Sequence, residues 1–528
     1  MRNLRPFSRH AHSVVLFVVL ATGSYAVSGF SRTVSYVVSG FSRTVTAAPA
    51  ETPLIDAVKA ADKTGVRTLI NQRVDVNAPQ PDGTTALHWA ADRDDPEMVE
   101  LLVRAGANVK AANRYGVTPM WLAGVNGNAA VIEMLLKAGA AANTVLPEGE
   151  TVLMTAARTG KVDAVKVLLD HGAEVNATEG WHRQTALMWA AAEDHPAVIE
   201  ALIARGAEIH ARSNGGFTAL LFAAREGRIA AVRTLLEAGA NLNDALPIRG
   251  RGARAATPAG PPGTGRSSGP AQAEVGLNAF LLAAANAHYE LAAWLLDRGA
   301  DPNAAPQGWT ALHQVSWVRK AGISGSNNPA PEGSGSVDSL EFVRKLVAKG
   351  AELNARVTKR PGMGVTTLNS IGATPFLLAA RTADAELMRL LAQLGADPRL
   401  GNEDNTTPLM VAAGLGTQSP GEDPGTEPEV LEAVAVALAL GNDLNAVDKN
   451  GETAMHGAAY KHVPSVVHFL AEKGAKIEVW NQPNKRGWTP LKIAEGVQRG
   501  MNIVSSRPTA AAISEVIASS HYRVQSAK

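Results

Sequence analysis

The sequence predicts an all-α solenoid, a stack of helix-turn-helix units joined by hairpin-like finger loops. The first observation is a fixed period. Six equivalent segments follow one another at steps of 33, 33, 33, 34 and 33 residues, and the Thr residues that open them are Thr52, Thr85, Thr118, Thr151, Thr185 and Thr218. The second observation is that every segment repeats the same internal pattern. A fixed period near 33 residues is typical of a solenoid in which each unit packs only on its neighbours.

Each segment begins with a short helical pattern. An entry such as TALH at Thr85 places a helix-capping Thr before the first turn, where several copies carry Pro. Pro is tolerated there because its missing N–H would have been unpaired. Ala90 and Ala91 follow, and small side chains let two helices approach closely. A second helix then shows apolar residues at helical spacing, such as Val99 and Leu102.

The second helix of each segment ends at a Gly, usually Gly-Ala. Glycine takes the left-handed conformation that terminates a helix. The glycines in this position are Gly106, Gly139, Gly172, Gly206, Gly239, Gly299, Gly350, Gly395 and Gly474. An Asn often stands a few residues later, and with the Gly of the finger it favours a tight turn. These residues are Asn77, Asn176, Asn243, Asn303, Asn354 and Asn445.

This pattern resembles the ankyrin repeat, whose family pattern is close to G-x-T-P-L-H-x-A-A…V-x-x-L-L-x-x-G-A-x-x-N. About twelve copies run from Thr52 to the last twenty residues, and the later ones open at Asn278, Thr310, Thr374, Thr407, Thr453 and Thr489. Three copies depart from the pattern. The first has Arg73-Val74 for Gly-Ala, the tenth has Gly441-Asn442, and the twelfth lacks a clear end to its second helix. Irregular end copies are expected because terminal units need a polar outer face.

The repeats define the predicted domain boundaries. Residues 1–26 form a signal peptide or N-terminal anchor, and 27–50 a duplicated low-complexity insertion and linker. Repeats 1–6 cover 51–245, a Gly/Pro/Arg-rich loop expected to be disordered covers 246–275, and repeats 7–12 cover 276–508. Insertions lie near 321–336, 356–370 and 414–428, and a capping helix or tail covers 509–528. Such insertions often lie on the side of a solenoid that binds a partner, but a low-complexity sequence more often forms a surface loop that the fold tolerates.

The N-terminus has the layout of a secretory signal. Three Arg residues precede the apolar run from Val14 to Ala21, and cleavage fits after Ala26 or Ala47. Residues 13–31 carry no charge over 19 positions. Because a bilayer requires about 20 apolar residues, an uncleaved anchor is the alternative. The Ala- and Arg-rich composition is typical of a GC-rich bacterial genome. Together with the signal, it leads us to expect a periplasmic or extracellular protein.

Composition excludes several classes of partner and chemistry. The chain has 50 Lys and Arg against 49 Asp and Glu, so it offers no long-range attraction to nucleic acid or anionic lipid. It has no Cys, which excludes disulfides, cysteine nucleophiles and thiolate metal sites. We expect no cofactor, metal or nucleic-acid partner. We also expect a monomer that contacts membrane only through an uncleaved N-terminal segment.

One motif resembles a phosphate-binding loop. Residues 260–267 read GPPGTGRS, but no apolar strand precedes them and no helix begins at once after them. Arg266 also stands where the motif needs Lys. Nucleotide binding is therefore the less favoured alternative.

Three histidines occupy the His position of the ankyrin pattern, namely His88, His313 and His456. We expect each to hold the Thr that opens its own repeat and nearby backbone, because a buried histidine with satisfied hydrogen bonds is far commoner than a ligand. His462 and His468 are close to His456 in number, but no acidic or Cys partner completes a zinc site.

The resemblance implies a function and a surface. In similar proteins, ligands meet the finger tips and the inner face of the first helices, at positions beside the finger Gly and just after Ala-Ala. Here those positions hold Arg114, Tyr115, Arg158, Phe217, Arg225, Glu226, Trp309, Trp317, Arg381, Tyr460, Lys461, Arg486 and Trp488. Exposed aromatic and Arg side chains are typical of interface hot spots, although packing between copies explains any single aromatic equally well. Trp89 and Trp189 are expected to pack between layers.

We therefore expect a non-enzymatic scaffold of the bacterial cell envelope that binds a protein or peptide through the concave ankyrin groove. A membrane-anchored organiser or spacer is the alternative. A nucleotide-binding protein that uses the GPPGTGRS loop is less favoured.

Overall fold

The computed structural model describes residues 52–247, 276–320, 331–359, 366–421, 423–499 and 502–526. The chain divides into two units, Met1–Thr52 and Pro53–Lys528, and every element below belongs to the second unit. The predicted signal or anchor, the duplicated stretch over 27–50 and the GPPGTGRS loop lie outside the described residues. So do 321–330 and 360–365, which belong to two of the predicted insertions.

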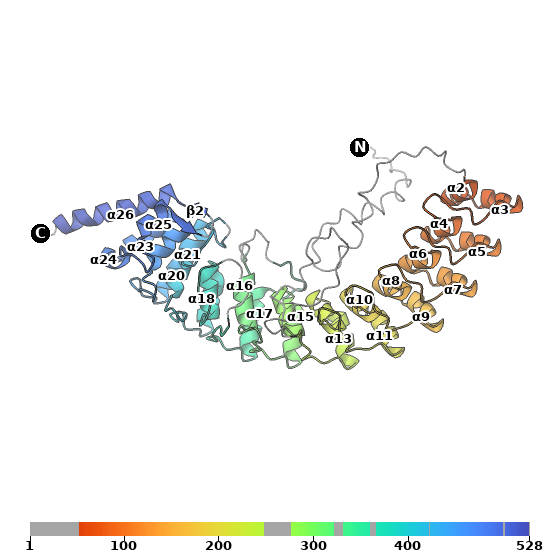
Figure 1. The fold of residues 1–528 in the computed structure, drawn as a ribbon. Coiled ribbons are helices and arrows are strands. Elements are labelled where there is room, and N and C mark those ends of the chain that lie inside the picture. The colour runs from red at the N-terminus through yellow and green to blue at the C-terminus, as the bar shows by residue number, and fades with distance from the viewer. Residues whose placement is uncertain are drawn as a thin grey trace, which may run out of the picture. The chain divides into compact units, whose positions relative to one another are not determined.

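The described residues form eleven consecutive helix pairs followed by a different C-terminal end (Figure 1). The first helices of the pairs are α2 (Pro53–Lys59), α4 (Ala86–Asp92), α6 (Pro119–Asn126), α8 (Val152–Thr159), α10 (Ala186–Ala192), α12 (Ala219–Arg225), α14 (Ala279–Ala285), α16 (Ala311–Val318), α18 (Pro375–Arg381), α20 (Pro408–Ala412) and α22 (Ala454–Lys461). The second helices are α3 (Lys63–Asn71), α5 (Pro96–Arg104), α7 (Ala129–Lys137), α9 (Val162–Asp170), α11 (Pro196–Ala204), α13 (Ile229–Glu237), α15 (Tyr289–Asp297), α17 (Ser339–Ala348), α19 (Ala385–Gln393), α21 (Glu427–Ala439) and α23 (Pro464–Glu472).

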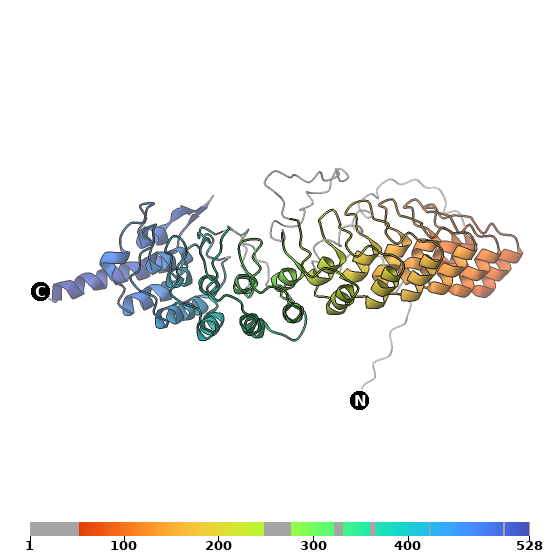
Figure 2. The ribbon, with the colours of Figure 1, turned by 90° about the horizontal axis from the view of Figure 1, so that it is seen from below.

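The pairs stack in chain order. Each first helix packs on the next first helix, as α8 does on α10, and most second helices pack on the next second helix, as α7 does on α9. Figure 2 shows this succession of neighbouring pairs from a second direction. The all-α solenoid predicted from the period is therefore confirmed.

The capping residues explain where each helix begins and ends. Thr151, for example, accepts a hydrogen bond from the backbone N–H of Met154 at 3.1 Å, which satisfies a donor in the first turn of α8. At the far end of a pair, Gly106 has a φ of +90°. A Cβ there would meet no atom within 4 Å, so the backbone conformation alone selects glycine.

The Asn residues after the second helices do more than favour a turn. The side chain of Asn176 donates to the carbonyl oxygen of Gly206 at 3.0 Å and accepts from the N–H of Glu208 at 2.9 Å. Asn77, Asn143 and Asn303 make the same pair of bonds to their following repeats. Each such Asn therefore ties one layer to the next.

The apolar core runs through the whole stack. Leu87 and Leu153 of first helices, and Val99 and Leu102 of a second helix, are buried. Because each layer covers its neighbour, stability is shared along the array as a sum of interfaces.

The C-terminal end departs from the repeat pattern. After α24 (Ile477–Trp480) and α25 (Pro490–Glu495), strands β1 (Val497–Arg499) and β2 (Asn502–Val504) pair antiparallel. Helix α26 (Arg507–Ser526) then packs on α23 and α25. This helix thus stands where a twelfth second helix would lie, after a hairpin that the sequence analysis did not anticipate.

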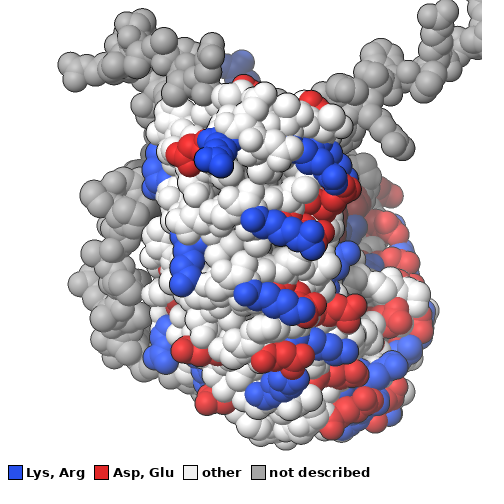
Figure 3. All heavy atoms as spheres, turned by 90° about the vertical axis from the view of Figure 1, so that its right-hand side faces the viewer, with Lys and Arg blue, Asp and Glu red and all other residues white. Residues whose placement is uncertain are grey.

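Charges of both signs alternate on the face drawn in Figure 3. Ion pairs connect neighbouring second helices, such as Lys63 with Glu97, or lie within one helix, such as Lys137 with Glu133. Within the described ranges, no helix is both long and apolar enough to cross a bilayer.

Candidate binding surface of the first helices

Three arginines stand at one structural position in different repeats. We call the two residues that follow Ala-Ala in a first helix the post-alanine positions. The first of them holds Arg158 in α8, Arg225 in α12 and Arg381 in α18. Since the helices are equivalent, these side chains leave the stack at equivalent places, and their surroundings can be compared directly.

Arg158 is exposed and lies over an aromatic ring. Its guanidinium carbon is 5.3 Å from the ring centroid of Trp189 in α10. Trp189 is buried between layers, as expected, and its indole N–H donates to the side-chain oxygen of Gln184 at 3.0 Å. Within the described residues the Arg158 guanidinium forms no ion pair, although its charge opposes the rise that burial causes in the pKa of Glu150. The arrangement holds an exposed cation against the ring of a buried tryptophan.

Arg225 also lies against aromatic rings, but its side chain is less exposed to solvent than that of Arg158. Its guanidinium carbon lies 4.9 Å from the ring centroid of Phe217 and 5.3 Å from that of Phe222. The guanidinium also donates to the carboxylate of Glu226 at 3.0 Å, and the side chain is only 11% exposed. Phe217 was expected at an exposed position. That expectation is wrong, because its ring stacks on Phe222 and is buried.

Arg381 and Lys461 are buried under the insertion at 414–428. The guanidinium of Arg381 pairs with the carboxylate of Asp423 at 2.9 Å, and both side chains are at most 5% exposed. The ammonium of Lys461 donates to the carbonyl oxygen of Pro424. Burial, with the nearby charge of Arg381, lowers the pKa of Lys461 to about 8. The expectation that these two side chains are exposed is therefore wrong, because the chain's own insertion covers them.

Tyr460 is likewise buried rather than exposed. Its hydroxyl donates to the carboxylate of Glu452 at 2.9 Å, and the amide of Asn484 donates to the same oxygen at 2.6 Å. Burial raises the pKa of Glu452, and burial together with the Glu452 charge raises the pKa of Tyr460. The residue joins two repeats instead of facing outward.

The remaining predicted positions lie on fingers or helix ends. Arg114 and Tyr115 are exposed together, with the guanidinium carbon 4.8 Å from the ring centroid. Exposed Arg486 lies 5.2 Å from the ring centroid of half-buried Trp488. Half-buried Trp309 donates through its indole N–H to Gln307 at 2.7 Å. The side chain of Trp317, a residue of α16, lies outside the described part of the chain.

One exposed tryptophan is absent from the positions predicted from the sequence. Trp181 is 45% exposed on the finger between α9 and α10. The buried carboxylate of Glu179 shapes this finger by accepting from the backbone N–H groups of Trp181, His182 and Gln184 at 2.6, 2.8 and 3.0 Å. The 34-residue step from Thr151 to Thr185 was the signal that could have found it, because the extra residue falls in this finger.

The insertion after α16 also folds back on its neighbours. The hydroxyl of Ser334 lies 2.9 Å from Nδ1 of His288, and the N–H of Ser336 donates to the carboxylate of Glu290 at 2.6 Å. Nε2 of His288 lies 2.9 Å from the carbonyl oxygen of Arg225. Burial lowers the pKa of His288, and the hydrogen bonds from Ser336 lower the pKa of Glu290. This segment therefore covers the turn between α14 and α15.

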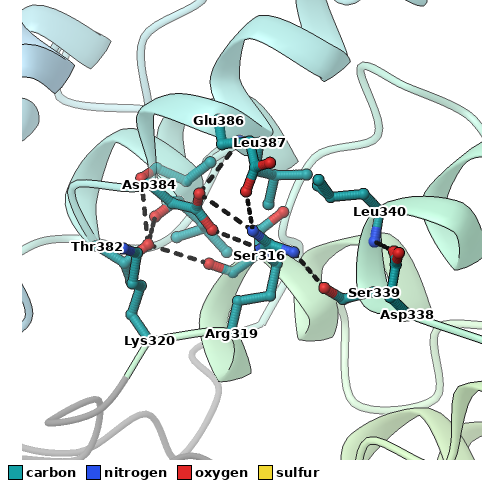
Figure 4. Close-up of polar contacts among 12 residues, drawn as sticks. Ser316, Arg319, Lys320, Asp338, Ser339, Leu340, Thr382, Asp384, Glu386 and Leu387 are labelled. Atoms are coloured by element: carbon teal, nitrogen blue, oxygen red, sulfur yellow. Dashed lines mark hydrogen bonds and ion pairs between the residues drawn. The ribbon is translucent and has the colours of Figure 1, made fainter.

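A charged cluster lies beside the two ends of the same insertion (Figure 4). Arg319 donates to Asp384 at 2.6 Å and to Glu386 at 3.1 Å, and it contacts the hydroxyl of Ser339. Nearby, Lys320 pairs with Glu429 at 2.7 Å. The cluster joins the end of α16 to α17, α19 and α21.

Each histidine of the repeat pattern holds the Thr that opens its own repeat, as expected, although the buried Nε2 of His456 has no hydrogen-bond partner among the described residues. Nδ1 of His88 lies 2.8 Å from the hydroxyl of Thr85 and accepts from its backbone N–H, and His313 and His456 do the same with Thr310 and Thr453. Burial lowers the pKa of His313 and His456 to about 4. Among the described residues, no three His, Asp or Glu side chains are grouped so that they could hold a metal ion.

The fold and the repeated capping pattern define a repeat protein built from helix pairs. Comparison with known families gives the finer class. A model described as ankyrin repeats (3 copies) matches residues 25–113, 54–145, 92–179, 122–213 and 181–245, and one described as ankyrin repeats (many copies) matches 280–317. The chain belongs to the ankyrin-repeat family.

One curated relative matches a stretch of the chain. The Bos taurus protein named inactive serine/threonine-protein kinase TEX14 is 26% identical over 190 residues, which are 34% of this chain. The match spans only 12% of that relative's length. Ankyrin repeats are protein–protein interaction scaffolds, and the family is typically non-enzymatic.

Proposed function

We propose that this chain is a non-enzymatic scaffold of the bacterial cell envelope, and that it binds a protein or peptide on the first-helix side of α4–α12. The observation that carries the proposal is an uneven distribution of exposed side chains. Arg114, Tyr115, Arg158 and Trp181 are exposed in this half. Farther along, Arg381 and Lys461 on the first helices are covered by the chain's own insertion, and among the candidate residues there Arg486 is exposed.

The chemistry of these exposed groups suits a protein partner. Arginine, tyrosine and tryptophan dominate the residues that lose most affinity on truncation, because each offers a large contact area and a directional donor. Here Arg114 contacts Tyr115, and Arg158 contacts Trp189, so both guanidinium groups are already oriented. An ordered side chain loses less entropy when it binds.

The envelope location rests on the N-terminal sequence. A basic start, an apolar run over 14–21 and the absence of Cys are all compatible with export. Mass spectrometry of the mature N-terminus tests this part. A start near Val27 or Ala48 supports cleavage and release, whereas an intact Met1 in the membrane fraction supports the anchored alternative.

Affinity capture from the envelope fraction tests the binding function. The full chain is used as bait beside a double variant, Tyr115→Ala with Trp181→Ala. We expect the intact chain to enrich a protein that the double variant enriches at least fivefold less, because each lost aromatic anchor costs 1 kcal/mol or more. If the intact chain and the double variant melt alike and enrich the same protein equally, this surface does not bind the partner.

A further inference from the structure

The insertion at 414–428 lies across the first helices as a bound peptide would. Its residue Gly414 is so close to α22 that an added Cβ would stand 2.3 Å from the Cβ of Lys461. Farther along, Asp423 reaches Arg381 of α18, and Pro424 accepts from Lys461. At Gly425 a Cβ would stand 2.6 Å from the Cβ of Ala383. This part of the chain thus contacts residues of two different repeats.

The contacts of this segment have a simple chemistry. A carboxylate meets the Arg at the first post-alanine position, a backbone carbonyl meets a Lys, and Gly residues allow close approach. The Arg381–Asp423 pair is buried, so the segment replaces the water that would otherwise solvate the guanidinium. The molecule therefore contains its own example of a ligand for this position.

Arg158 occupies the equivalent position in α8 but has no such ligand. It is exposed and lies on the ring of Trp189. The carboxylate of Glu150 is close enough to feel its charge, but no described carboxylate forms an ion pair with it. Arg225 in α12 is intermediate, because its neighbour Glu226 accepts from its Nε. Of the three equivalent arginines, Arg158 is the one whose surroundings match those that Arg381 would have without the insertion that carries Asp423.

We propose that the first-helix face around α8 and α10 binds an extended acidic segment of a partner protein, with an Asp or Glu carboxylate of that segment paired to Arg158 as Asp423 is paired to Arg381. The proposal rests on the proposed binding function and specifies the chemistry of the partner. Small residues such as Gly and Pro beside the acidic residue allow the backbone to approach the helix ends, and the aromatic face of Trp189 keeps the guanidinium in place.

A peptide taken from the chain itself provides the probe. Fluorescently labelled QSPGEDPGTEP, which is residues 418–428, is titrated with the full-length protein and followed by anisotropy. A second peptide, QSPGQNPGTQP, has the same shape without carboxylates. We expect the acidic peptide to bind at least fivefold more tightly than the amide peptide, and to weaken as salt is raised because the pair is exposed to screening.

Three variants separate the sites. Arg158→Ala should weaken binding of the acidic peptide at least fivefold, and Arg158→Lys should restore part of the loss, since a lysine retains the charge but not the bidentate geometry. Arg104→Ala, on the second helix α5, serves as the matched control and should leave binding unchanged. Equal melting curves establish that the variants are folded.

Either of two results would overturn the proposal. One is binding of the acidic peptide that Arg158→Ala leaves unchanged, and the other is no binding below about 1 mM, a level too weak for a specific anchor. The capture experiment remains independent of both. A partner captured through Tyr115 and Trp181 but insensitive to Arg158→Ala would retain the scaffold function and refute the acidic-segment inference.

Discussion

At the scale of a single residue, His313 links the repeat pattern to a protonation state. Its Nδ1 accepts from the backbone N–H of Thr310, and its Nε2 lies 3.2 Å from the carbonyl oxygen of Ala373 in the next repeat. These contacts require the neutral ring with the proton on Nε2. A protonated ring would lose the acceptor at Nδ1 and would place a charge in the core.

This requirement predicts a loss of stability in mild acid. The pKa of His313 is about 4 in the folded protein and about 6.5 in an unfolded chain. The stabilising contribution is therefore complete above pH 6.5 and is lost as pH falls from 6.5 towards 4. At pH 5.5 the loss from this residue amounts to about 1 kcal/mol.

Urea unfolding at pH 7.5 and 5.5 measures this effect. The control is His313→Met, because the chain itself places Met154 and Met188 at the same position. This variant should show a smaller difference between the two pH values than the parent protein. An unchanged difference would mean that His313 does not control the acid response.

A second prediction concerns Ala61, which has a φ of +56° in the turn between α2 and α3. The equivalent position holds Gly127, Gly160 and Gly227, all with positive φ. Since Ala61 is exposed, Ala61→Gly removes strain without loss of packing, and we expect up to about 1 kcal/mol of stabilisation. Ala130→Gly, within α7, should destabilise by about 1 kcal/mol, and melting curves of both variants check the sign.

At the scale of the element, Arg319 determines how α16, α17 and α19 meet. Its partner Asp384 is 1% exposed and also caps α19 by accepting from the N–H of Leu387 at 3.1 Å. Removing the guanidinium leaves a buried carboxylate without its charge partner. We expect Arg319→Ala to lower the free energy of unfolding by about 3 kcal/mol.

The matched control is an ion pair in solvent. Arg389 and Glu432 pair at 2.8 Å between α19 and α21, with both side chains about half exposed. Arg389→Ala should cost less than about 1 kcal/mol. Chemical unfolding of both variants tests the contrast, and similar losses would show that burial of the Asp384 pair contributes little.

Elements formed by local spacing could be predicted from the sequence. The 33-residue step, the capping Thr and the terminating Gly are short-range signals, and they placed the eleven helix pairs that precede the C-terminal end. The roles of His88 and His313 also followed, since each contacts a Thr three residues away. These interactions need no knowledge of distant parts of the chain.

The candidate surface was harder to predict because insertions act at long range. Asp423 is 42 residues from Arg381, and no periodic pattern indicates that one would cover the other. The burial of Lys461 has the same cause, whereas Phe217 and Tyr460 are buried by neighbours within the repeats themselves. The β1–β2 hairpin lies beyond the last regular repeat, where the period no longer constrains the chain.

At the scale of the whole described stack, the two halves differ in what covers the first helices. Between α4 and α12 the exposed side chains include Tyr115, Arg158 and Trp181. From α14 onward, Ser334, Ser336 and Asp423 come from insertions and bind the repeats of their own chain. A partner would therefore meet mainly the first half, although both halves are built from the same repeat.

Site-specific photo-crosslinking in cells tests this division most directly. A photoreactive phenylalanine analogue replaces Trp181, which is exposed on a finger, or Arg104, which is exposed on the second helix α5. The account predicts a covalent adduct with a partner protein from position 181 and none from position 104. Adducts from position 104 alone would contradict it, because the partner would then lie on the opposite side of the stack.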